Sequence, residues 1–213
     1  MFGRKRGYDR AQLLSDAARA QRKRKYGKAI ALYRRVLARE PGNGDIHRRL
    51  APLLAQTKQR TESARSYRRA AEELLRQGFV ERAIGVYREA THHIPREGEV
   101  WMALADLEVS RGRRVDALQA LWAGRRQLRA RAERPQAIKL LERAHELEPA
   151  DLVVSFELAG LLVRSRQRPR ARAVLERLAA ATHGHELQRV RARQLWLFPG
   201  PRTAWRWLRV HLS

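Results

Sequence analysis

The sequence predicts an all-α protein built as a solenoid of antiparallel helix pairs, and three observations support that prediction. One pattern occurs three times, as KYGKAIALYRRVLAREP at 25–41, FVERAIGVYREATHHIP at 79–95 and ERPQAIKLLERAHELEP at 133–149. The prolines that end these stretches, Pro41, Pro95 and Pro149, follow one another at intervals of 54 residues. Within each stretch, apolar residues recur at i, i+3, i+4 and i+7, which is the period of an amphipathic helix.

Short turn-forming segments separate the periodic stretches, for example PGNGD at 41–45 and PREG at 95–98. Loops this short make consecutive helices antiparallel neighbours. Helix pairs at a fixed period stack on one another, because one pair cannot bury its own apolar face. The predicted helices span residues 9–24, 27–39, 45–57, 61–77, 80–92, 99–111, 114–132, 135–147, 151–164, 168–182, 185–197 and 202–211.

The chain of 213 residues carries a formal net charge of +24, which is concentrated at its two ends. Residues 1–28 hold ten Lys and Arg against two acids, and residues 158–213 hold twelve Arg against two acids. Charge of this sign favours an acidic partner, nucleic acid or an anionic surface, although a coding bias toward arginine gives the same composition. The chain has no Cys, which excludes disulfides and thiolate metal sites.

The repeated pattern resembles the tetratricopeptide repeat (TPR), a helix-turn-helix unit of about 34 residues. In the unit 64–97 the characteristic positions are filled by Tyr67, Ala71, Leu74, Ala83, Tyr87, Ala90 and Pro95. The unit that starts at 98 matches through Trp101, Leu104, Ala105, Gly112 and Ala117. The small residues allow two helices to cross closely, so Ala83 and Ala105 are expected to be buried. Arg125 departs from the pattern, because a small residue is expected there.

The 54-residue period resembles a bacterial-type TPR variant with three helices per period. This resemblance implies a right-handed α-solenoid over residues 10–183. A basic arm at 1–9 is expected to precede it, and an atypical cap of Trp- and Arg-rich helices at 184–213 to follow it.

The resemblance also implies a non-catalytic scaffold or adaptor that binds a protein or peptide partner in a concave groove. The charged ends predict that this partner is acidic and that the basic ends contribute to binding. Helical projection places a mixed set of residues on the inner wall: Arg48, Arg65, Arg68, Glu99, Met102, Asp106 and Phe156. An ordinary solvated face is the alternative interpretation for each of them.

No catalytic motif, phosphate-binding loop or cofactor site is visible in the sequence, and neither enzyme activity nor a cofactor is predicted. The histidines of HHIP at 92–95 and HGH at 183–185 lack further ligands at metal-binding spacing, so no metal site is predicted. No apolar run is long enough to span a membrane. A cytoplasmic location is expected.

Nucleic acid or another polyanion is the alternative partner, bound by a basic patch in the C-terminal half. The patch comprises Arg164, Arg166, Arg168, Arg170, Arg172, Arg189, Arg191 and Arg193. Its sign suits phosphates, but no aromatic residue is interleaved in 163–173 for bases to stack on.

The predicted helix 151–164 is apolar nearly all round and must be covered on both sides. The chain's own C-terminal segment is the favoured cover, with a partner as the alternative. As a helix, 202–211 would place arginines on one side, with Trp205, Leu208 and the following Leu212 on another. A basic amphipathic helix with Trp is also typical of peripheral membrane contact, which is the third alternative.

Overall fold

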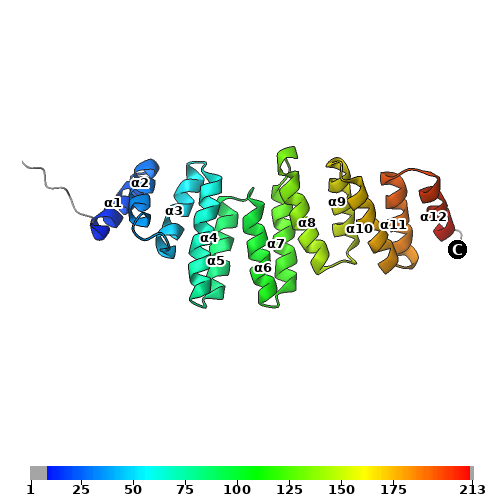
Figure 1. The fold of residues 1–213 in the computed structure, drawn as a ribbon, viewed down its shortest axis with the longest axis horizontal. Coiled ribbons are helices and arrows are strands. Elements are labelled where there is room, and N and C mark those ends of the chain that lie inside the picture. Colours follow the sequence, from blue (N-terminus) through cyan, green and yellow to red (C-terminus); the bar gives the residue numbers. More distant parts are fainter. Residues whose placement is uncertain (1–8, 212–213) are drawn as a thin grey trace, which may run out of the picture. The chain divides into compact units, whose positions relative to one another are not determined.

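The computed structural model describes residues 9–211 of the chain, and this part is helical without a strand (Figure 1). Leu212 and most of the predicted basic arm lie outside the described residues. The helices are α1 (Arg10–Arg22), α2 (Tyr26–Leu37), α3 (Gly44–Gln56), α4 (Arg60–Arg76), α5 (Val80–His93), α6 (Gly98–Ser110), α7 (Arg114–Gln127), α8 (Arg134–Leu147), α9 (Leu152–Arg164), α10 (Arg168–Ala181), α11 (Gly184–Leu197) and α12 (Pro201–His211). The fold is the predicted all-α repeat solenoid.

The chain forms two compact units, which divide after Arg111. In the first unit each helix from α1 to α6 packs on the next, and α3 and α4 also contact α5 and α6 respectively. In the second unit α7 to α12 pack in the same consecutive way, and α9 also contacts α11. Contacts between helix n and helix n+2 are typical of stacked helix pairs.

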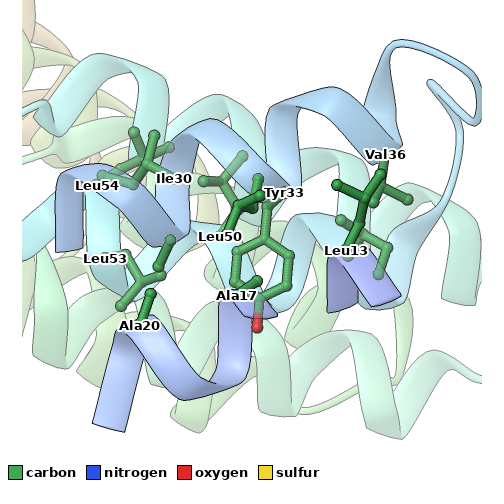
Figure 2. Close-up of a cluster of buried hydrophobic side chains, with 12 residues drawn as sticks. Leu13, Ala17, Ala20, Ile30, Tyr33, Val36, Leu50, Leu53 and Leu54 are labelled. Atoms are coloured by element: carbon green, nitrogen blue, oxygen red, sulfur yellow. The ribbon is translucent and has the colours of Figure 1, made fainter. Parts of the chain in front are cut away.

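The core of the first unit begins between α1, α2 and α3, where apolar side chains from all three helices interlock (Figure 2). The ring of Tyr33 is buried beside Ala17 of α1 and Leu50 of α3. A larger residue at position 17 would push α1 away from α2, because interiors pack without spare volume. Ala83 and Ala105 are fully buried as predicted.

Helix ends follow ordinary capping chemistry. The side chains of Asp9, Asn43 and Asp151 accept hydrogen bonds from the backbone N–H groups three residues later, at 3.0, 3.2 and 3.0 Å respectively. Several helices end on a residue with positive φ, and at Arg166 (φ 60°) this residue is not glycine. There the N–H groups of Arg166 and Gln167 close the end of α9 on the carbonyls of Val163 and Leu162.

The predicted helix 114–132 is wrong beyond Gln127. The chain leaves the helix at Leu128, whose side chain is buried, and forms a short 3-10 turn at Arg131–Glu133 before α8. The Glu133 carboxylate accepts a hydrogen bond from the Ala130 N–H at 2.8 Å and so stabilises the break.

Candidate functional site

Arg48, the first residue of the predicted inner wall, joins α3 to α5. Its guanidinium lies 3.1 Å from the Glu89 carboxylate, which also accepts a hydrogen bond from the Tyr67 hydroxyl of α4 at 3.4 Å. Burial, and then the neighbouring Glu89, raise the pKa of Tyr67, so this hydroxyl remains a donor. Arg48 therefore belongs to a three-helix polar cluster.

The other predicted wall residues of the first unit lie on α4 and α6. Arg68 of α4 pairs with Glu99 of α6, while Arg65 is exposed and makes no side-chain ion pair within the described residues. Met102 is partly buried, and Asp106 is exposed. The structure thus brings Arg68 and Glu99 together, whereas Arg48 interacts with α5.

Phe156 belongs to the second unit, where its ring is half-buried on α9. The Arg193 guanidinium of α11 lies 5.7 Å from the centre of this ring and donates a hydrogen bond to the Phe156 carbonyl at 3.5 Å. Burial, and then the nearby Arg164, lower the pKa of Arg193. The apolar helix α9 is packed against α8, α10 and α11 of its own chain.

Ion pairs that connect helix n to helix n+2 recur along the chain. They are Arg34–Glu62, Arg48–Glu89, Arg68–Glu99, Arg125–Glu157, Arg170–Glu142 and Arg206–Glu176. We call these the stitching pairs. Arg125 stands where the repeat prefers a small residue, and it lies 2.5 Å from Glu157 of α9 and 3.2 Å from the Leu128 carbonyl. The arginine at this position therefore connects α7 to α9.

Three members of the predicted basic patch interact within the protein. Arg170 pairs with Glu142, Arg191 lies 3.4 Å from Glu176 and 2.7 Å from the Gln194 side-chain oxygen, and Arg193 is stacked on Phe156.

Three further members of the patch face solvent. Arg164, Arg166 and Arg189 are exposed, and their side chains make no ion pair or hydrogen bond within residues 9–211. Arg166 also occupies the left-handed position that closes α9. The patch is therefore not one uniform surface.

The remaining two patch members, Arg168 and Arg172, lie over the buried ring of Phe198 at 5.6 and 5.1 Å from its centre. Beside them is a hollow of about 480 Å³ between α10, the Phe198–Gly200 turn and the start of α12, where Arg202 and Arg206 also contribute. A second hollow of about 440 Å³ shares Arg172 with the first. We call Arg168, Arg172, Arg202 and Arg206, with Phe198, the arginine groove.

The arginine groove has a surplus of positive charge. Its acid is Glu176, and this carboxylate is already paired with Arg191 and with Arg206. Arg172 and Arg202 make no hydrogen bond or ion pair within the described part of the chain, although Arg172 stacks on Phe198. Such cations are available to an external carboxylate or phosphate.

Sequence reasoning missed Phe198, Arg202 and Arg206 as groove residues, since the repeat register is lost after 183. It also missed Trp196, which is 69% exposed and stacks beside Arg193 at 4.7 Å from the ring centre to the guanidinium. The only signal for the groove was the turn composition FPGP at 198–201.

Two arrangements of titratable side chains bear on metal binding and on a buried Ser–His contact. The described residues contain no cluster of three or more His, Cys, Asp or Glu able to hold a metal ion. Ser155 lies 3.1 Å from the His145 ring nitrogen Nδ1, but Ser155 is fully buried and cannot reach a substrate. Among the described helices, none is long and apolar enough to cross a membrane.

The stacked antiparallel helices, the buried small residues at their crossings and the polar inter-helix faces define a helical repeat protein. A family profile described as tetratricopeptide repeat matches residues 14–73 and 68–125, and a second profile of the same description matches 128–193. The chain belongs to the tetratricopeptide-repeat family. Members of this family are generally non-catalytic and bind protein or peptide partners, and their fold suggests an interaction scaffold.

Similar solved structures include a candidate protein-binding protein from Bacteroides ovatus (18% identity, 96% of this chain and 98% of that one covered, TM-score 0.40). PilF of Pseudomonas aeruginosa is 17% identical over 95% of this chain and 89% of its own, with a TM-score of 0.31. YrrB, a TPR protein with an unusual peptide-binding site, is 11% identical over 84% and 89%, with a TM-score of 0.30. No protein of curated function matches the sequence.

Proposed function

We propose that this protein is a non-catalytic scaffold whose arginine groove binds an acidic segment of a protein partner. The observation that carries the proposal is the charge of the groove. Arg172 and Arg202 line a hollow whose one acidic residue, Glu176, already pairs with Arg191 and Arg206. Unpaired guanidinium groups bind carboxylates in a bidentate geometry, and Phe198 holds Arg168 and Arg172 in place.

The inner wall predicted in the first unit is a weaker candidate for the same partner. Its arginines Arg48 and Arg68 already have carboxylate partners, so an acidic segment would have to displace Glu89 or Glu99. Arg65, which is exposed there, and the partly buried Met102 would add contacts to a longer partner. We expect the groove to supply most of the affinity.

A fluorescent peptide of ten glutamates tests the proposal by anisotropy. The double variant Arg168→Gln/Arg172→Gln should weaken binding by about tenfold, which corresponds to a loss of about 1.4 kcal/mol. The control Arg35→Gln/Arg49→Gln makes the same charge change at exposed residues of the first unit and should leave binding within about twofold of wild type. Equal losses in the two variants would show that only net charge matters.

Single-stranded nucleic acid is the second candidate, favoured by the exposed Trp196 beside Arg193. An exposed ring next to arginines is a stacking platform for bases. We expect weak binding of an oligonucleotide that falls by roughly 10³ between 50 and 200 mM salt if five or six phosphates are contacted. Salt-resistant, sub-micromolar binding that Trp196→Ala abolishes would make nucleic acid the ligand.

A further inference from the structure

Helix α12 has an inner and an outer apolar face. Trp207 and Val210 are partly buried on the inner face, and α12 packs on α11. The Val210 carbonyl accepts a hydrogen bond from the Gln188 side chain of α11 at 3.4 Å. The inner face therefore anchors the helix to the repeat array.

The outer face has no cover within the described residues. Trp205 is 67% exposed and Leu208 is 41% exposed, and Pro201 extends the same face one turn earlier. Single exposed apolar residues are ordinary. Elsewhere in the described chain large exposed hydrophobic residues occur at most once per helix, whereas α12 carries two of them one turn apart.

Arginines flank the outer face along one edge of α12. Arg202, Arg206 and Arg209 recur at helical spacing, and within residues 9–211 only Arg206 has an ion-pair partner, Glu176. No Asp or Glu occurs in the sequence of α12. The helix thus presents Trp and Leu beside unpaired cations, which is the pattern of a helix that lies in the plane of a membrane surface.

We propose that the outer face of α12 docks on an anionic lipid surface. Trp205 and Leu208 would enter the headgroup region, while Arg202 and Arg209 would contact lipid phosphates. The helix has 11 residues, roughly 16 Å at 1.5 Å per residue, so it would lie flat. A second copy of the chain is the poorer occupant, because each copy carries a net charge of +24.

Vesicle flotation with the full chain tests this inference through variants at residues outside the arginine groove. Wild type should float with vesicles of phosphatidylcholine and phosphatidylglycerol at 3:1, and should not float with pure phosphatidylcholine. Trp205→Ala/Leu208→Ala should bind the anionic vesicles about tenfold more weakly, and Arg209→Gln about threefold more weakly. Phe79→Ala removes an exposed aromatic ring from the first unit and should bind like wild type.

Circular dichroism checks that the variants remain folded. The proposal is overturned if wild type ignores anionic vesicles, or if Trp205→Ala/Leu208→Ala binds them as well as wild type does. A variant that keeps vesicle binding but loses the glutamate peptide would instead assign the outer face to the protein partner, and would also overturn it.

Discussion

The arginines of α2 to α6 and those of α10 to α12 are attached to the same kind of helical scaffold but have different neighbours. In the first region Arg34, Arg48 and Arg68 each reach a carboxylate two helices further on. In the second region ten arginines between residues 168 and 211 share two acids in sequence, Glu176 and Glu186. The three named arginines of the first region are paired and connect helices, whereas the second region leaves Arg172 and Arg202 available to a partner.

Within the C-terminal region, α11 and α12 differ in the helices on which they pack. α11 packs on α9 and α10 and buries Val190, Gln194 and Leu197. By contrast, α12 packs on α11, reaches α10 through the exposed pair Arg206–Glu176, and has no buried residue. Truncation after His183 should therefore expose the apolar faces of α9 and α10 and cause aggregation or loss of cooperative unfolding. Truncation after Gly200 should preserve cooperative unfolding. Thermal melts of the two truncated proteins compare these effects, and equal behaviour would contradict this difference.

Both regions depend on small residues at helix crossings, and this dependence gives the next largest effect. Ala105 is fully buried, so Ala105→Arg should destabilise the protein by about 2–5 kcal/mol through overpacking and a buried charge. Urea unfolding measures the loss. A midpoint unchanged from the parent would mean that the repeat register is wrong.

Two stitching pairs differ in burial and should differ in energy. The Arg125 side chain is 16% exposed, whereas that of Arg68 is 47% exposed. Arg125→Met leaves Glu157 partly buried without its cation and should cost about 1–3 kcal/mol. Arg68→Met should cost about 1 kcal/mol or less, as for other exposed pairs. Denaturant unfolding of both variants measures the two losses of unfolding free energy. Equal losses would show that burial does not determine the energy of these ion pairs.

The smallest expected effect is a pH dependence at His145. Burial, and then the neighbouring Arg177, lower the pKa of His145 in the folded state. The unfolded chain then binds more protons near its pKa of about 6.5, so the contribution of His145 is complete above that pH and decreases as pH falls. His145→Gln should flatten the slope of stability between pH 7 and 5, by at most about 1.4 kcal/mol per pH unit. A slope that stays the same in His145→Gln would contradict this account.

The helices and the buried alanines could be predicted because they follow from residue period and size. The end of α7 could not: no Gly or Pro occurs between Gly124 and Pro135, and a local contact of Glu133 with the Ala130 N–H decides the break. The helix propensities of the residues carry no information about a hydrogen bond between a side chain and the backbone.

The candidate site was predicted in part. The arginine-rich segment was recognised, but sequence spacing could not separate Arg170, held by Glu142, from Arg172, which lines the groove. The stitching pairs lie about one repeat apart in sequence, as for Arg34 and Glu62, yet a chain with 46 basic residues offers many such combinations. The groove also depends on the turn around Phe198, where the repeat pattern no longer applies.

The difference between the paired arginines of the first region and the unpaired arginines of the arginine groove is tested most directly by hydrogen exchange of the full chain with and without the ten-glutamate peptide. Bound peptide should slow exchange of backbone amides in α10 and at the start of α12, across residues 168–206, and leave α3 to α6 unchanged. Slower exchange in α3 to α6, with no change in α10 to α12, would contradict the account and assign partner binding to the first unit.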